Sequence, residues 1–173
     1  YVPIRDLPVY KRQAFRENVL GSQAPNAATA GKTLFEDANI RLWTLDDEVV
    51  IASIKSKMHT ISAEVTAGLA KGLEIAEAGY KGMVIWTQDG PFSAGADLQS
   101  MMPAFMSGGG KAIAPFEKQL QDFMLSLRYS NVPTVAAMHG LALGGGCELA
   151  VHAAKRVAAM ETYVGLVEVG VGL

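Results

Sequence analysis

Apolar and polar positions follow two different periods along the chain, and together they predict a mixed α/β domain. Apolar-rich segments at 40–44 and 49–54 flank an acidic turn at 46–48, which is typical of a β-hairpin. From Ile61 to Leu73 an apolar residue then returns every four positions, with charged residues off that stripe. This spacing predicts an amphipathic helix that is capped by Ser62 and ends near Tyr80.

The alternation of strands and helices continues to the end of the chain. A short apolar run at 83–86 predicts a buried strand, and small residues from Ser93 open a helix that we expect to end near Met102–Pro103. Residues 107–110 predict a mobile break, followed by a helical stripe over 116–127. A strand at 132–138 then leads into another helix. Strands that alternate with helices over short loops favour a mainly parallel sheet.

The first 33 residues have a different composition. They combine three prolines with basic residues, and 21–31 is small and polar, as in a linker. We therefore expect a linker from a preceding domain over 1–33 and a folded domain over 34–173, in a chain that starts partway through a longer protein. A phosphate-binding loop ending at Thr33 is excluded, because Asn26 stands where that motif needs glycine.

Composition narrows the function classes. The 173 residues suffice for one domain with a core, and the net charge of −2 lacks the basic footprint of a nucleic-acid-binding protein. Cys147 is the only cysteine, so disulfide frameworks are excluded, and we expect a reducing, cytoplasmic location. The three histidines share no spacing that indicates a metal site, and the sequence contains no run long enough to span a bilayer.

Candidate chemistry gathers at Gly144–Gly146, between the last predicted strand and helix. Glycines let backbone N–H groups approach a ligand closely, and a helix start adds unpaired N–H donors, which suits a developing oxyanion. Glu148 and Glu168 lie in apolar runs, so we expect both to be buried. Burial raises a carboxyl pKa toward neutrality, as general acid/base chemistry requires.

Each of these features also has a purely structural interpretation. Glu148 is compatible with a carboxylate favoured by the helix dipole, Glu168 with a surface position on a strand, and the glycines with close packing. A dinucleotide-binding domain is disfavoured, because Gly140 and Gly144–Gly146 do not match G-x-G-x-x-G.

Two motifs carry a resemblance to a known family. The stretch SAGADL at 93–98 and the stretch GLALGGGCELA at 140–150 resemble the crotonase superfamily, specifically its enoyl-CoA hydratases. The resemblance implies the crotonase-like (ClpP/crotonase) fold of repeated ββα units. Because the chain stops at Leu173, it also implies that the C-terminal helices of that fold are missing.

The resemblance also implies roles for individual residues. The N–H groups of Ala96 and Gly145 would form an oxyanion hole for the thioester carbonyl, and Glu148 and Glu168 would be the two catalytic glutamates. Contacts to the coenzyme A part of the substrate would come from Ala94, Gly95, Ala96, Asp97, Leu98 and Gly144. The domain itself would bind no cofactor and no metal, and NAD would be needed only by a dehydrogenase part of the parent protein.

Some positions depart from the family pattern. His139 stands where the family often has Asn, and 152–155 replaces a stretch that contains Asp. The N-terminal segment resembles the stretch that joins a 3-hydroxyacyl-CoA dehydrogenase part to a hydratase part in multifunctional β-oxidation enzymes. The parent would then be bifunctional.

The function implied is an enoyl-CoA hydratase that adds water to trans-2-enoyl-CoA thioesters in fatty acid β-oxidation. One alternative is a double-bond isomerase of the same superfamily, although isomerases generally use one carboxylate where this chain has two. Another is an inactive CoA-binding or assembly fragment. As partners we expect an acyl-CoA thioester and further copies of the chain in a homo-oligomer, because truncation would expose an apolar face.

Overall fold

The computed structural model describes residues 26–168, and the chain divides into two units between Ala30 and Gly31. The second unit begins with strand β1 (Lys32–Glu36), which was not predicted and starts inside the range assigned to a linker. The rest of the predicted linker lies mainly outside the described residues. Within the described residues, no helix has the length and apolar character needed to cross a membrane.

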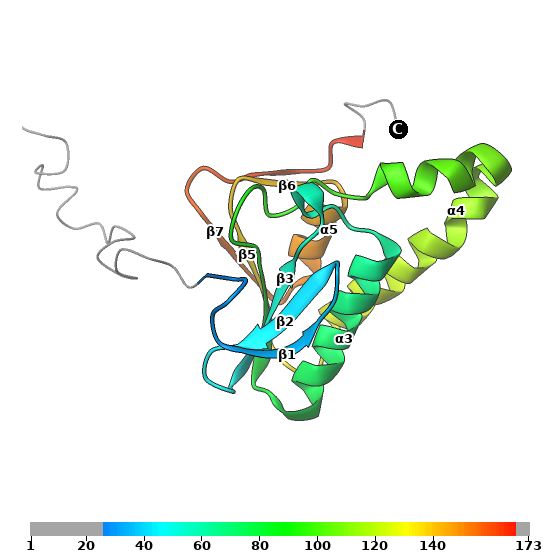
Figure 1. The fold of residues 1–173 in the computed structure, drawn as a ribbon. Helices are drawn as coiled ribbons and strands as arrows, with labels where there is room; N and C mark the ends of the chain where they lie inside the picture. The colour runs from blue at the N-terminus through cyan, green and yellow to red at the C-terminus, as the bar shows by residue number, and fades with distance from the viewer. Residues whose placement is uncertain (1–25, 169–173) are drawn as a thin grey trace, which may run out of the picture. The chain divides into compact units, whose positions relative to one another are not determined.

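Six strands form the main sheet of this unit (Figure 1). Their order is β1, β2 (Ile40–Thr44), β3 (Val49–Ile54), β4 (Gly82–Trp86), β5 (Thr134–Met138) and β7 (Lys155–Ala158). The first three strands pair antiparallel, and the pairs from β3 through β4 and β5 to β7 are parallel. The predicted hairpin and the mainly parallel sheet are therefore confirmed.

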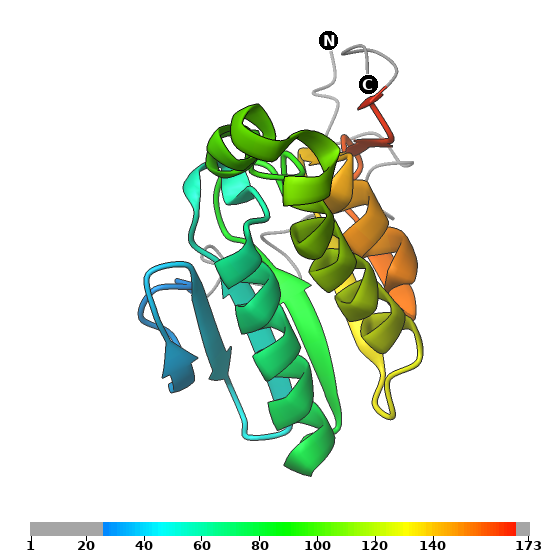
Figure 2. The ribbon, with the colours of Figure 1, turned by 90° about the vertical axis from the view of Figure 1, so that its right-hand side faces the viewer.

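Three helices lie side by side against one face of this sheet, with the C-terminal half of α4 between the other two (Figure 2). They are α3 (Ala63–Gly79), α4 (Leu98–Arg128) and α5 (Gly145–His152). The apolar side chains between the helices and the sheet form one buried cluster. This buried cluster therefore holds the three helices in place against the sheet.

The predicted helix at 62–80 is confirmed as α3. Ser62 caps it by accepting a hydrogen bond from Val65 N at 3.3 Å. The stripe that predicted the helix faces inward, since Val65 and Leu69 are fully buried and Leu73 nearly so. Burial of a side chain of this size contributes about 1.5–3 kcal/mol, so this face anchors α3 to the sheet.

The predicted end of the next helix at Pro103 is wrong. Helix α4 runs through Pro103 and Pro115 and ends at Arg128. Its regular conformation breaks only at Gly109, where φ is +59° and ψ is −152°. Glycine adopts such angles without a steric cost. The break predicted at 107–110 is thus a kink at Gly109 that separates two helical segments of α4.

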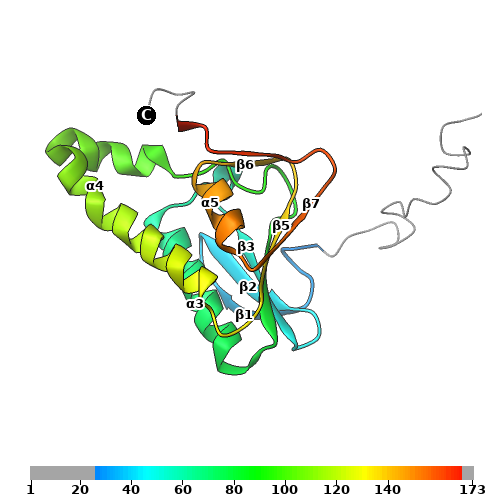
Figure 3. The same cartoon turned by 180° about the vertical axis from the view of Figure 1, so that it is seen from behind.

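A short extended segment precedes each of the three helices in the sequence, and these segments pair with one another as a second row, apart from the main sheet. Ile61 bridges Ala96, Ser93 bridges Ala142, and β6 (Leu141–Leu143) pairs with β8 (Tyr163–Gly165), in each case parallel. Three times along the chain, a strand of the main sheet is therefore followed by a segment of this row and then by a helix. Figure 3 shows the third of these repeats, in which α5 follows β6. This repetition agrees with the ββα units that the resemblance implied.

Candidate active site

The loop Ser93–Asp97 precedes α4 and is fixed by main-chain hydrogen bonds on both sides. On one side Ser93 N donates to Leu141 O, and Leu143 N donates to Ser93 O, each at 3.0 Å. On the other side Ile61 N donates to Gly95 O at 2.8 Å, and Asp97 N donates to Ile61 O at 3.0 Å. The loop is therefore one member of the second row, with little freedom to move.

This fixation decides where the N–H of Ala96 points. Gly95 O and Asp97 N both face Ile61, so the N–H between them points the other way, as alternate groups of an extended chain do. Within residues 26–168, the N–H of Ala96 has no hydrogen-bond acceptor. It is therefore a donor held open by the backbone around it.

The side chain of Ser93 braces the loop from inside. It is fully buried, its Oγ donates to His59 O at 2.7 Å, and it accepts from Gly95 N at 3.1 Å. His59 itself contacts the same loop, since its Nδ1 lies 2.6 Å from Pro91 O. Neither role was predicted, and the 34 positions between Ser93 and His59 leave no local signal in the sequence.

Helix α5 brings a second open donor to this loop. Gly145 is its first residue, so its N–H has no intrahelical partner, and no acceptor for it lies among the described residues. A Cβ atom at Gly145 would lie 3.5 Å from Ala96 N. The two N–H groups that were predicted to form an oxyanion hole are therefore neighbours.

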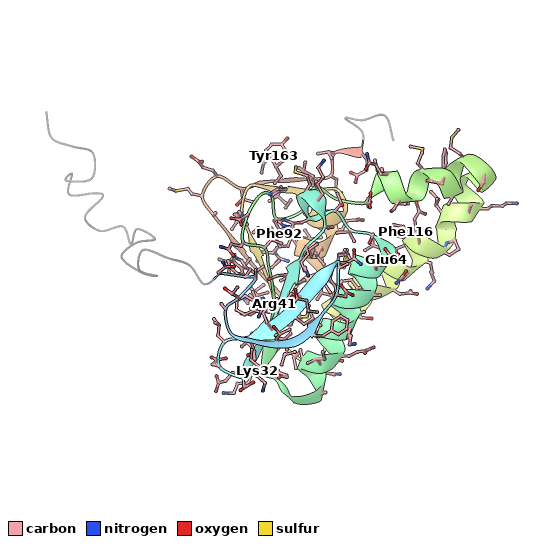
Figure 4. The ribbon with its side chains drawn as sticks, in the orientation of Figure 1. Lys32, Arg41, Glu64, Phe92, Phe116 and Tyr163 are labelled. Atoms are coloured by element: carbon pink, nitrogen blue, oxygen red, sulfur yellow. The ribbon has the colours of Figure 1, made fainter. Side chains whose placement is uncertain are left out.

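Glycine at position 146 makes this close approach possible. A Cβ atom there would lie 2.7 Å from the Cβ of Ser93 and 2.8 Å from its carbonyl oxygen. Such distances are well inside normal van der Waals contact. A side chain at Gly146 would thus push the two loops apart. In Figure 4, Phe92, which precedes Ser93 in the chain, lies in the interior of the protein, and Tyr163 lies on its surface.

The carboxylate of Glu168 lies at the start of α5. Its Oε1 is only 2.7 Å from the point that a Cβ atom of Gly144 would occupy, and its side chain is half-buried. Glu148, one turn into α5, is exposed. The prediction that both carboxylates are buried is therefore wrong for Glu148 within the described residues, because Leu149 and Ala150 take the inward face of the helix.

The Cys147 thiol responds to both carboxylates. Burial raises the pKa of Cys147, and the negative charges of Glu148 and Glu168 raise it further. The two glutamates therefore share one electrostatic neighbourhood, although 20 positions separate them in the sequence. The cysteine itself is buried.

The residues predicted to contact coenzyme A have varied structural tasks. The N–H of Ala94 donates to Met58 O at 3.1 Å, and the left-handed φ of +97° at Gly95 fits only glycine well. Asp97 caps α4 by accepting from Gln99 N and Ser100 N, and Leu98 is largely exposed. None of these structural roles tests the predicted contacts with coenzyme A, which therefore stay predictions.

A pocket of about 430 Å³ opens elsewhere, between α3 and α4. None of the predicted site residues lines this pocket, so it lies apart from the loop Ser93–Asp97 and from the corner at Gly144–Gly146. Among residues 26–168, His, Cys, Asp and Glu side chains form no group of three that could hold a metal ion. The pocket is lined by Thr66, Ala70, Pro115, Lys118, Gln119, Asp122, Phe123 and Ser126.

Comparison with curated proteins finds relatives among multifunctional enzymes. The chain is 36% identical over 138 residues to a Bacillus subtilis (strain 168) protein named "Probable 3-hydroxyacyl-CoA dehydrogenase", covering 80% of this chain and 18% of that protein. It is 32% identical over 156 residues to the human mitochondrial methylglutaconyl-CoA hydratase, covering 86% and 44%. The chain thus spans less than half of these relatives.

Solved structures and a family model give the same assignment. An enoyl-CoA hydratase from Thermoplasma volcanium GSS1 matches with a TM-score of 0.69 at 26% identity, over 81% of this chain and 56% of that one. An enoyl-CoA hydratase from Polaromonas sp. JS666 matches with 0.70 at 26%, over 78% and 53%. The model described as Enoyl-CoA hydratase/isomerase matches residues 47–173. Since that match covers more than half of the chain, this protein belongs to the enoyl-CoA hydratase/isomerase family and has its crotonase fold.

Proposed function

We propose that this chain forms the hydratase part of a multifunctional fatty acid oxidation enzyme and adds water to trans-2-enoyl-CoA thioesters. The observation that carries the proposal is the meeting of two open N–H donors, on Ala96 and Gly145, with a carboxylate at the adjacent Gly144. The names of the relatives support the same chemistry, since they include fatty acid oxidation enzymes and a hydratase. NAD would act only in a dehydrogenase part outside this chain.

The two N–H groups would stabilise the charge that develops on the thioester oxygen. When water adds to the β-carbon, the π electrons move toward the carbonyl and leave an enolate oxygen. Fixed donors stabilise such an oxygen without reorganising, and loss of one typically costs about 3–4 kcal/mol. The hydrogen bonds that fix Gly95 and Asp97 would hold the Ala96 donor in place before substrate arrives.

The two glutamates would move the protons. Glu148 would accept a proton from water as the water oxygen bonds to the β-carbon, and Glu168 would give its proton to the α-carbon. Glu148 thus gains one proton and Glu168 loses one, so the substrate gains the atoms of one water molecule. The positions of both side chains support a shared role, since Glu168 lies against Gly144 and Glu148 lies in the first turn of α5.

One observation favours a second candidate, a CoA-binding or assembly fragment without activity of its own. Glu148 is exposed, whereas a base for this reaction works best in a site that excludes water. The solved relatives are also about twice as long as the part that this chain matches. We therefore expect the 173-residue chain alone to hydrate crotonyl-CoA slowly or not at all.

The test is Glu148→Gln in the natural gene product that contains this chain. Loss of the conjugated enoyl absorbance measures hydration of crotonyl-CoA, and calorimetry with a saturated acyl-CoA measures binding. We expect hydration to fall by about 10²–10⁴-fold, which is the typical contribution of a positioned acid or base. Binding should stay near that of the unaltered protein.

The matched control is Glu117→Gln, which makes the same change on an exposed position of α4. It should retain full hydration. Near-normal turnover by Glu148→Gln would refute the assignment of Glu148 as the base. An active protein that moves the double bond of 3-enoyl-CoA but does not hydrate 2-enoyl-CoA would instead support the isomerase alternative.

A further inference from the structure

The geometry points to Gly144 as the positioning residue for the carboxylate of Glu168. In this inference, which rests on the proposed function of Glu168, the missing side chain at position 144 is what lets Glu168 reach the start of α5. Apart from the contact with coenzyme A that was predicted for it, Gly144 would not touch the reacting atoms and would act on the reaction through Glu168.

The backbone brings the two residues together. Strands β6 and β8 pair in parallel, with Leu143 opposite Gly165, and Gly144 N then donates to Gly165 O at 2.9 Å. This hydrogen bond extends the pairing one residue past β6, to the corner where α5 begins. Glu168 lies only three positions after Gly165, the last residue of β8, so the bond restricts where its backbone lies.

The space at Gly144 is already occupied by the carboxylate. A Cβ atom there would lie 2.7 Å from Glu168 Oε1 and 3.8 Å from its Cδ. Carbon and oxygen do not approach so closely without repulsion, so an alanine would displace the carboxylate. Gly144 also has a φ of +49°, a conformation that disfavours any L side chain. A test has to separate this backbone strain from the contact with Glu168.

The three consecutive glycines thus differ in what their missing side chains leave room for. The space at Gly146 is taken by Ser93, whereas a Cβ at Gly145 would meet only ordinary contacts, the nearest at 3.5 Å. Only at Gly144 is the neighbouring atom part of a carboxylate. The effect of a substitution at Gly144 should therefore depend on whether Glu168 is present.

A double-mutant cycle on the 173-residue chain isolates that dependence. Urea unfolding is measured for the unaltered chain, Gly144→Ala, Glu168→Ala and the double variant. The strain at positive φ is the same in both backgrounds and cancels, so the cycle measures the contact between the two residues. We expect Gly144→Ala to raise the unfolding constant about two- to threefold more when Glu168 is present, because Oε1 is the end of a flexible side chain that can move aside at little cost.

Equal losses in both backgrounds, together with an unchanged titration of the Cys147 thiol, would overturn the inference. If Gly144→Ala alone does not fold, recovery of folding in the double variant supports the inference, and failure of both variants overturns it. Gly140→Ala is the matched control, because Gly140 has a similar φ of +60° but its Cβ would have ordinary contacts, the nearest at 3.5 Å. Its effect on unfolding should not change when Glu168 is removed.

A second measurement follows the carboxylate directly. Cys147 is the only cysteine, so ¹³C-labelled cysteine gives one signal whose pH titration reports the charges near the thiol. Glu168→Gln removes the charge of that carboxylate and should lower the pKa of the thiol. We expect Gly144→Ala to lower it as well, toward the Glu168→Gln result, and Gly140→Ala to leave it unchanged. A thiol that titrates in Gly144→Ala as in the unaltered chain would contradict the inference.

Activity separates this inference from the proposed function. In the natural gene product, Gly144→Ala should lower kcat for crotonyl-CoA hydration about tenfold or more with little change in KM, and shift the pH profile of kcat. If Glu168→Gln itself hydrates normally, the proposed role of Glu168 fails. The unfolding cycle and the thiol titration would still decide whether Gly144 positions its carboxylate.

Discussion

Replacing Ser93 by alanine tests whether its buried hydroxyl holds the Ala96 donor in place. The change removes the hydrogen bond to His59 O and leaves the buried Gly95 N–H without its acceptor. A buried unsatisfied donor costs about 1–3 kcal/mol, and the lost hydrogen bond to the partly buried His59 O adds about 1 kcal/mol. We therefore expect Ser93→Ala to lower the free energy of unfolding by about 2–4 kcal/mol.

Urea unfolding of the chain measures this loss, with the midpoint falling and the slope unchanged. Native-state hydrogen exchange should also increase more at Gly95 and Asp97, whose N–H groups are hydrogen-bonded in this loop, than in the helices. Ser107→Ala is the control, since the Ser107 hydroxyl is exposed and bonds only to Ala104 O within α4. The control should change stability by less than about 0.5 kcal/mol. A loss in Ser93→Ala no larger than in the control would refute the reasoning.

Two further predictions follow from the same contacts. Gly145→Ala should fold with stability unchanged or up to about 1 kcal/mol higher, because alanine suits a helix better than glycine and its Cβ meets only ordinary contacts. Its methyl group would nevertheless lie 3.5 Å from Ala96 N, in the space proposed for the thioester oxygen. Hydration in the natural gene product should therefore fall about 10²–10³-fold. Normal turnover would exclude this position for the oxygen. The hydrogen bond from Ser62 Oγ lowers the pKa of Glu64, so the stability that Glu64 contributes is present above its unfolded pKa of about 4.5 and is lost as the pH falls below it. Glu64→Gln should therefore lower the urea midpoint at pH 7 but not at pH 3, and an equal loss at both pH values would contradict this.

The sequence predicted the parts of the fold that depend on local patterns. The stripe through Val65 and Leu69 has a single period and a strong cap at Ser62, so α3 follows from it. Strand β1 has only five residues and just two partly buried side chains in its middle, which gives no comparable pattern. Helix α4 also continues past Pro103, although proline disfavours helix interiors. None of residues 98–108 is buried, so neither a local pattern nor packing against the core predicts this continuation.

The candidate site was predictable where a motif fixes the backbone and not where distant segments meet. The glycines at 144–146 indicated a corner with open N–H groups, and the resemblance of the two motifs to a known family assigned the donors to Ala96 and Gly145. The brace from Ser93 to His59 spans 34 positions and follows from no local pattern. The exposure of Glu148 was mispredicted, because apolar neighbours along the chain do not decide which side of a helix faces the core.

The parallel row of extended segments also has a consequence for folding kinetics. Ala96 and Gly145 become neighbours only after Ser93 pairs with Ala142, and closing the chain between such distant positions costs entropy before any contact compensates for it. Helix α3, which depends on local contacts, can form early, whereas the paired donors can form only in a late and cooperative step. During refolding, far-ultraviolet circular dichroism should thus recover before the proposed binding of acyl-CoA does.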